Sequence, residues 1–211
     1  MFKVGESKMK RIVLGLMGIV LLCCASSQAN VLVSFNFDNG TGDISMEAAG
    51  LMATPFASVV GSANWVDHPG NGKAIGAVGF KDSGNYFTFT LTVPAGYKVD
   101  VTGLQFDDVK ENGMNASNWL LKYQVGSGPL TNGPGGSVHS SWASNTAALS
   151  GLTNLQNTTL IFRLAPTSPS NNTKHWYLDN ATLSGTVTVV PEPATVAILA
   201  LGGLALLRKR K

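Results

Sequence analysis

Between residues 30 and 190, hydrophobic side chains recur at every second position in several short runs. Residues 31–37 place Val and Phe on one face, and residues 86–93 alternate Phe, Leu and Val with Tyr or Thr. A period of two puts successive side chains on opposite faces of a β-strand. No stretch of ten or more residues in this region has the 3.6-residue period of an amphipathic helix. The sequence therefore predicts an all-β domain.

Further strands and the turns between them follow the same pattern. Strands are expected at residues 99–106, with a bulge at Gly103, and at residues 119–125, 159–164 and 181–189. Clusters of Gly, Asn, Ser and Pro separate the runs, at Asp38-Asn39-Gly40 and at residues 69–72, 132–136 and 166–172. This regular alternation over residues 30–187 predicts one antiparallel β-sandwich, with a jelly roll as the expected topology.

Residues 1–29 have the parts of a secretory signal peptide. Basic residues at positions 8–11 precede an apolar run at residues 12–22, and Ala29 ends a segment of small residues. We expect signal peptidase to cleave after Ala29. Met9 is an alternative start to Met1. Cleavage would remove Cys23 and Cys24, so the mature domain would contain no disulfide and no catalytic thiol.

The other end of the chain carries a short motif, an apolar segment and a basic cluster. The motif is Pro191-Glu192-Pro193, and the cluster is Arg208, Lys209, Arg210 and Lys211. The fourteen residues at 194–207 would make a helix of ~21 Å, which is short for a bilayer core of ~30 Å. This length favours a transient signal over a permanent transmembrane helix, with the basic stop on the cytoplasmic side.

These three elements, in this order, resemble the PEP-CTERM sorting signal of Gram-negative bacteria. The resemblance covers residues 188–211. It implies a precursor tethered transiently in the inner membrane, cleavage by an exosortase near the motif, and delivery to the cell surface or extracellular matrix.

The preceding domain has a weaker resemblance of its own. Residues 95–99 followed by 104–107, and residues 160–164 followed by 176–181 and Gly185, look like stretches that recur in PEP-CTERM ectodomains. Those ectodomains resemble jelly rolls of the galactose-binding or carbohydrate-binding type. The resemblance implies a fold and a setting, and it names no ligand.

Charge and motif content exclude several functions. Residues 30–190 contain seven Lys and Arg against ten Asp and Glu, a formal charge of −3, so the domain lacks the basic character of a nucleic-acid-binding protein. His68, His139 and His175 stand outside any zinc-binding pattern, and no serine lies in a Gly-x-Ser-x-Gly elbow. We therefore expect a protein that is not an enzyme.

The best candidate for an ion-binding site is a site for calcium. Asp38-Asn39 follows the first strand and Asp179-Asn180 precedes the last, and these two strands are often neighbours in a jelly roll. Their oxygens could then form a structural Ca²⁺ site, since calcium takes six to eight oxygen ligands. The alternative is that Asp38-Asn39-Gly40 is only a turn and that Asp179 bonds within its own loop.

Four tryptophans are candidates for contact with sugar rings. Trp119 alternates with core residues and is expected in the core, and Trp176 could equally lie in the core beside Leu178. Trp65 and Trp142 lie in polar segments and are the better candidates for a glycan-binding surface.

An acidic cluster supplies the one candidate for hydrolysis. Asp107, Asp108 and Glu111 follow a strand, and a glycosidase needs two carboxyl groups ~5–10 Å apart. Adjacent residues of a strand point to opposite faces, which argues against pairing of Asp107 with Asp108. A solvated loop is the expected structure here.

The sequence as a whole predicts an exported, surface-sorted β-sandwich. Its expected role is that of a structural or adhesive component of an exopolysaccharide-rich biofilm matrix. A carbohydrate-binding module is the first alternative, and an extracellular glycan hydrolase is the second.

Overall fold

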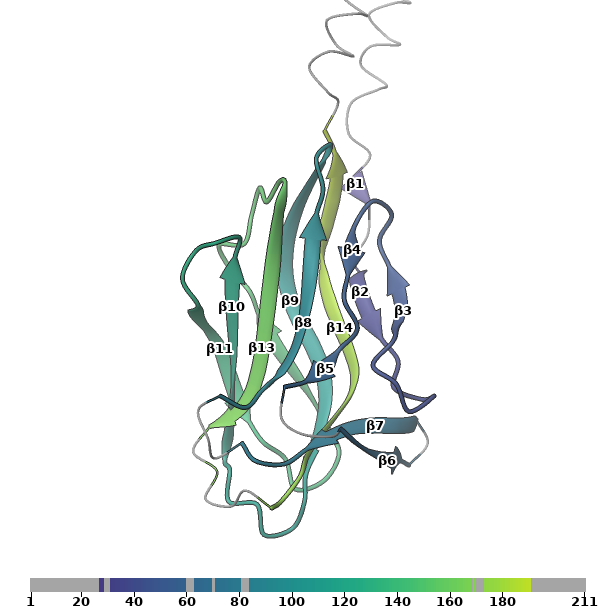
Figure 1. Ribbon diagram of the computed structural model, residues 1–211, viewed down its shortest axis with the longest axis vertical. Helices are drawn as coiled ribbons and strands as arrows, with labels where there is room; N and C mark the ends of the chain where they lie inside the picture. The colour runs from purple at the N-terminus through teal and green to yellow at the C-terminus, as the bar shows by residue number, and fades with distance from the viewer. Residues whose placement is uncertain are drawn as a thin grey trace, which may run out of the picture. The chain divides into compact units, whose positions relative to one another are not determined.

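The computed structural model describes residues 27–28, 31–59, 63–69, 71–80, 84–167, 169 and 173–190. In these residues every regular element is a β-strand, and the strands form two antiparallel sheets (Figure 1). The antiparallel all-β prediction is confirmed. The predicted signal and sorting helices fall on residues outside this description. Among the described residues, no helix has the length and hydropathy needed to cross a bilayer.

The larger sheet, sheet A, contains the first and the last strands of the domain. Its strands are β1 (Ser27–Gln28), β2 (Val31–Phe35), β3 (Ile44–Glu47), β6 (Asn64–His68), β7 (Gly72–Ala77), β9 (Tyr97–Lys110), β12 (Ala143–Ala148) and β14 (Trp176–Val189). The central order is β12-β9-β14-β2-β3, and the β6–β7 hairpin joins through pairing of β7 with β14. The expected pairing of the first long strand with the last is therefore present as β2 against β14.

The second sheet, sheet B, is built from β4 (Met52–Ala53), β5 (Ala57–Ser58), β8 (Phe87–Val93), β10 (Asn118–Val125), β11 (Thr131–Ser137) and β13 (Thr158–Thr167). Its order is β11-β10-β13-β8-β4, with β5 also paired to β8. From β8 to β14 the chain crosses repeatedly between the sheets, so most sheet neighbours are distant in sequence. Such crossing is expected of a jelly roll.

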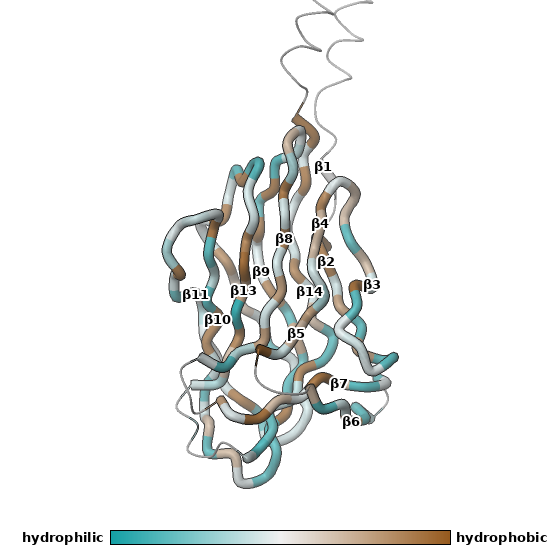
Figure 2. Tube along the Cα trace, viewed as in Figure 1, coloured by the Kyte–Doolittle hydropathy of each residue, from teal (hydrophilic) through white to brown (hydrophobic). Residues whose placement is uncertain are grey.

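The core fills the space between the sheets with the alternate side chains that the sequence pattern predicts. In β8 the residues Phe87, Phe89, Leu91 and Val93 are buried while the threonines between them face outward. Figure 2 shows brown segments alternating with pale ones along β8. Burial of each large apolar side chain stabilises the fold by ~2 kcal/mol. All the core residues lie between Leu32 and Val187, and residues 28–187 form one compact unit.

Strand β9 changes its buried face part of the way along. Val99 and Val101 are buried at odd positions, whereas Leu104 and Phe106 are buried at even positions. One extra residue at 102–103 produces this change of phase, as a bulge does. The structure thus agrees with the bulge expected at Gly103.

One glycine-rich segment was predicted as a turn and forms a strand instead. Residues 132–136 were expected to be a turn, but they lie within the edge strand β11, where Pro134 is tolerated because an edge need not donate every N–H.

In β14, a Cβ added at Gly185 would lie 2.1 Å from the carbonyl oxygen of Asp100 in β9. Glycine at position 185 is therefore required by strand packing.

Candidate functional site

Each of the three histidines in the described domain bonds to a carboxylate through Nδ1. The pairs are His68–Asp179 at 2.6 Å, His139–Asp108 at 2.6 Å and His175–Glu111 at 2.9 Å. A proton on Nδ1 donates to the carboxylate in each pair, so the second ring nitrogen is directed away from that carboxylate. The pairs join segments that are 31 to 111 residues apart in sequence.

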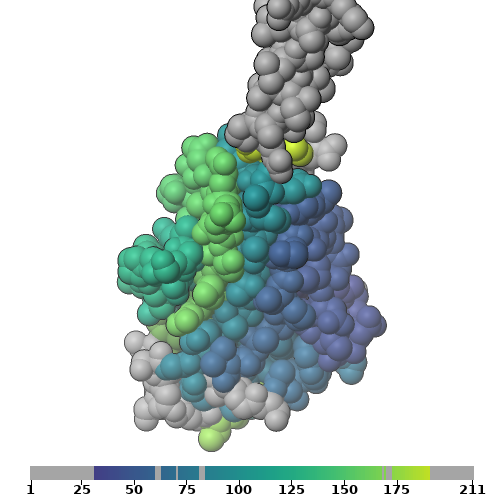
Figure 3. Space-filling model, turned by 45° about the horizontal axis from the view of Figure 1, so that its top comes forward, coloured from purple at the N-terminus to yellow at the C-terminus, as the bar shows by residue number. Residues whose placement is uncertain are grey.

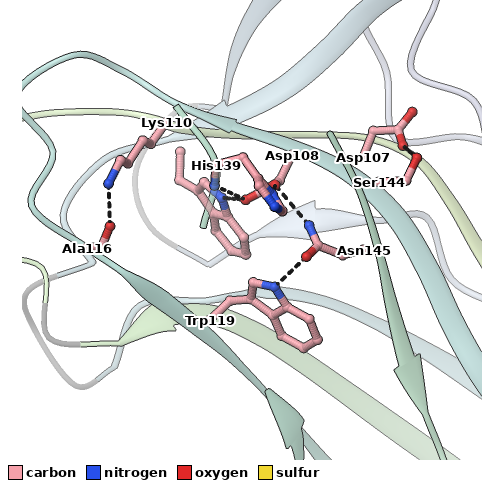
Figure 4. A network of polar contacts seen from close by, with 9 residues as sticks. Asp107, Asp108, Lys110, Ala116, Trp119, His139, Ser144 and Asn145 are labelled. Atoms are coloured by element: carbon pink, nitrogen blue, oxygen red, sulfur yellow. Dashed lines mark hydrogen bonds and ion pairs between the residues drawn. The ribbon is translucent and has the colours of Figure 1, made fainter. Parts of the chain in front are cut away.

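Asp108 is the centre of a buried polar network (Figure 4). Its side chain is fully buried, and it accepts hydrogen bonds from His139 Nδ1, from Asn145 Nδ2 at 2.8 Å and from Trp176 Nε1 at 2.8 Å. Asn145 in turn accepts a bond of 2.9 Å from Trp119 Nε1. This network ties β9 and β12 to β14 in sheet A and to β10 in sheet B, so its first role is structural.

The prediction of a solvated loop for the acidic cluster is wrong for Asp107 and Asp108, which lie in a strand, and Asp108 is also buried. Asp107 and Asp108 both lie in β9, and they do point to opposite faces, as the sequence analysis expected. Asp107 accepts hydrogen bonds from Ser144 and from Asn180, on the side away from Asp108. Because the two carboxylates face different surroundings, they cannot flank one glycosidic bond.

Glu111, the third member of the acidic cluster, is held by two basic neighbours. Lys174 Nζ lies 2.6 Å from Oε1, and His175 bonds to Oε2 through both its backbone N–H and Nδ1. These hydrogen bonds, with that from Lys174 contributing most, lower the pKa of Glu111 from 4.5 to about 2. A carboxyl group with so low a pKa is a poor general acid at neutral pH.

The lowered pKa of Glu111 predicts a specific acid sensitivity. A carboxyl whose pKa is lower in the folded state stabilises the fold above pH 4.5, and this contribution is lost as the pH falls from 4.5 toward 2. We expect wild type to be more stable than Glu111→Gln at pH 7, and the difference to shrink across that window. Urea unfolding of both proteins at pH 7, 4 and 2.5 measures it. A difference that is constant with pH would contradict the prediction.

A surface pocket of about 580 Å³ adjoins this cluster. Residues 110–115 and Ser140 line it. Lys110 Nζ donates a 2.7 Å bond to the carbonyl of Ala116, and Glu111 is engaged by Lys174, so both charged groups at the pocket have partners. Both charged side chains that line the pocket, Lys110 and Glu111, are therefore already bonded within the protein.

Two of the four proposed calcium ligands, Asp179 and Asn180, already form hydrogen bonds within the protein. Asp179 is almost fully buried, and its oxygens accept from His68 and from the backbone N–H of Asn180. Burial raises the pKa of Asp179 above its usual value, although the bond from His68 opposes the shift. The Asn180 side chain donates to Asp107, while Asp38 and Asn39 lie in the exposed turn after β2.

Calcium at these residues stays a proposal. Within the described part of the chain, no three His, Cys, Asp or Glu side chains cluster as metal ligands. A calcium ion would have to replace His68 as the partner of Asp179. A calcium-dependent rise in the melting temperature that Asp179→Ala abolishes would establish the site, and an unresponsive wild type would remove it.

The four tryptophans divide largely as expected. Trp119 and Trp176 are in the core, with exposures of 2 % and 0 %. Trp142 is partly exposed and stacks on the His68 ring, with centroids 3.8 Å apart. Trp65 is also partly exposed, but it packs against the core beside Phe37. Both glycan candidates are thus partly exposed, and their role in sugar binding stays a prediction.

Two basic residues that the sequence analysis did not single out lie side by side on sheet B. Lys122 of β10 and Arg163 of β13 are directly opposed in the strand register. They are the sole charged residues in the six strands of this sheet. A sequence signal for them existed, because each is a charged residue at an outward position of an alternating run.

Comparison with known proteins assigns the C-terminal segment. The PEP-CTERM protein-sorting motif matches residues 189–211. Pro191, Glu192, Pro193 and the basic residues 208–211 lie outside the described residues, as does Ala29 at the expected signal-peptide cleavage site. The motif indicates an exported protein with a membrane-anchored precursor that an exosortase processes. No curated protein sequence matches this chain.

Several solved carbohydrate-binding modules are similar in fold at low identity. The CBM22-1 xylan-binding domain of Paenibacillus barcinonensis Xyn10C is 14 % identical, with a TM-score of 0.45, over 76 % of this chain and 97 % of that domain. The C-terminal family 22 module of Clostridium thermocellum Xyn10B is 12 % identical, with a TM-score of 0.47, over 74 % and 95 %. The family 11 module of Clostridium thermocellum is 16 % identical, with a TM-score of 0.36, over 73 % and 96 %. Likenesses of this order give this chain no ligand.

Proposed function

We propose that this protein is a structural or adhesive component of an extracellular polysaccharide matrix. The observation that carries the proposal is the sorting motif at residues 189–211, directly after a self-contained β-sandwich of residues 28–187. Export followed by exosortase cleavage would leave the sandwich as the part that functions outside the cell. Its mechanism is display, with weak and repeated contacts to surrounding glycans.

The internal pairing of the polar groups supports a scaffold over an enzyme. Asp108, Asp179 and Glu111 each hold a histidine, and two of these carboxylates are buried. Such closed networks fix strands in place, whereas a general acid or base has to reach a substrate. Residues 30–190 also contain no cysteine that could act as a nucleophile.

The sorting step is tested by changing the motif. In the native host, a variant with Pro191→Ala, Glu192→Ala and Pro193→Ala should accumulate as uncleaved precursor in the membrane fraction. The exosortase would no longer find its recognition sequence, so the matrix fraction should lose the protein. Immunoblots of the membrane, medium and matrix fractions measure this distribution. The adjacent Thr195→Ala variant is the control and should be sorted normally.

Two outcomes would count against the proposal. Processing and release of the triple variant at wild-type levels would remove the sorting mechanism. Wild-type protein that is processed but recovered only as free protein in the medium would remove the matrix role while leaving sorting intact.

A further inference from the structure

We infer that the outer face of sheet B binds an acidic polysaccharide through Lys122 and Arg163. This inference rests on the proposed matrix function and names the class of glycan that the domain would contact. The first observation is the distribution of charge. Residues 30–190 contain ten carboxylate side chains, yet none lies in a strand of sheet B. A domain with a net negative charge therefore has one sheet whose strands carry only positive charge.

The register places the two cations in one row across the sheet. Lys122 pairs with Arg163, and Arg163 pairs with Thr88 of β8. All three side chains are on the outer face, because their strand neighbours Leu121, Leu164 and Phe87 are buried. Directly opposed side chains have Cβ atoms ~5 Å apart, and like charges in such positions destabilise a sheet. The fold thus accepts a repulsion that a single carboxylate in the row would relieve.

Neither cation has an ion-pair partner among the described residues, whose ion pairs involve Lys174 and the three histidines. The guanidinium of Arg163 is held over the Tyr86 ring, 4.5 Å from its centroid, and its Nε is buried without a hydrogen-bond acceptor. An unsatisfied buried donor is rare in folded proteins and carries a free-energy cost. A carboxylate bound at the two Nη groups would not satisfy Nε, but it would give the guanidinium a partner of opposite charge.

The chemistry around the two cations suits a sugar carboxylate. Thr88 lies in the same row as the two cations, and Thr90 follows two residues further along the outer face of β8. Hydroxyl groups next to a pair of cations can engage both parts of a uronic acid, since its ring offers hydroxyls and one carboxylate. Figure 3 shows part of the domain surface, where β13 (green) lies beside the teal strands of sheet B.

A nucleic acid is the less suitable polyanion. Its affinity comes from neutralising several phosphates, and proteins that bind it present a basic patch or stripe. The strands of sheet B carry two cations, which suits a polymer whose carboxylates stand among hydroxyl groups.

The test measures binding of residues 30–190 to polygalacturonate, to uncharged hydroxyethylcellulose and to double-stranded DNA. This segment contains the whole core, and cooperative thermal unfolding is confirmed for each variant first. We expect saturable binding to polygalacturonate that weakens with added salt, and little binding to the other two polymers. Arg163→Gln and Lys122→Gln should each weaken it about tenfold or more, as expected for loss of a charged hydrogen bond.

Lys73→Gln is the matched control, because Lys73 is an exposed lysine of β7 in sheet A. It makes the same change of charge and should leave the affinity unchanged. Arg163→Lys should fall between wild type and Arg163→Gln, since it keeps the charge but loses the planar fork. If Arg163→Gln does not fold, Lys122→Gln at the partly exposed neighbouring position carries the test.

Absence of binding to polygalacturonate would overturn the inference, as would equal binding to hydroxyethylcellulose or to DNA. Binding that neither Arg163→Gln nor Lys122→Gln weakens would also overturn it. These failures are distinguishable from failure of the proposed function. A protein that is sorted and retained in the matrix, yet binds no acidic polymer, would lose only the sheet B site.

Discussion

Replacing Asp108 with alanine is expected to lower the free energy of unfolding by about 3–5 kcal/mol. The substitution removes the shared acceptor of His139, Asn145 and Trp176. The donors on Asn145 and Trp176 are buried, and an unsatisfied buried donor costs about 1–3 kcal/mol. For a domain of this size the loss corresponds to a melting temperature lower by about 10 °C. Urea and thermal unfolding followed by circular dichroism measure both quantities.

Asp107→Ala is the matched control for this prediction. Asp107 is the neighbouring aspartate of the same strand, but its partners Ser144 and Asn180 lie at exposed positions. We expect its loss to cost less than about 1 kcal/mol, since hydrogen bonds near the surface are replaced by water. Asp108→Asn should fall between the two, because it keeps the shape of the side chain but not its charge. Equal costs for Asp108→Ala and Asp107→Ala would show that the buried network does not stabilise the fold.

Trp176→Ala is expected to destabilise the domain by about 3–5 kcal/mol. The Trp176 side chain is fully buried, and its ring contacts Phe80, Phe87 and Phe106 at centroid distances of 5.9, 5.8 and 6.3 Å. Alanine would leave a large cavity between the sheets and also remove one of the donors to Asp108. The midpoint of urea unfolding, with the slope checked for constancy, gives the change in free energy.

Trp142→Ala provides the comparison with the same change of side chain. Trp142 is partly exposed, and the ring contact that it makes is a stack on His68. Loss of one such stack costs about 1 kcal/mol. Trp176→Phe should cost less than Trp176→Ala, since it keeps an aromatic ring and leaves a smaller cavity, although it too loses the bond to Asp108. If Trp142→Ala proved as damaging as Trp176→Ala, burial would not be what distinguishes these two tryptophans.

Local patterns in the sequence predicted the strands that have one apolar face. The runs at residues 31–37, 86–93, 119–125 and 159–164 appear as β2, β8, β10 and β13 with small shifts of their ends. These succeed because alternation is a property of a single strand and shows directly which face is buried. Strands β11 and β12 were missed, since their residues are small or polar and they lie at sheet edges.

The polar network shows what a linear pattern cannot supply. In sequence, Asp107, Asp108 and Glu111 form one acidic group, and nothing local separates them. The structure gives each a different environment, because their partners come from β12, from β14 and from the segments preceding β12 and β14. The same holds for Lys122 and Arg163, which are 41 positions apart and meet only through the register of β10 with β13.

By itself, the sequence determined the fold class, the outward and inward faces of the main strands, and the sorting of the protein through residues 189–211. Each of these depends on residues close together in the chain, whose period or order can be read directly. Only the tertiary structure decided which histidine each carboxylate holds, and that two cations of one sheet have no ion-pair partner among the described residues. Those contacts depend on strand register, which is set by the packing of the whole sandwich.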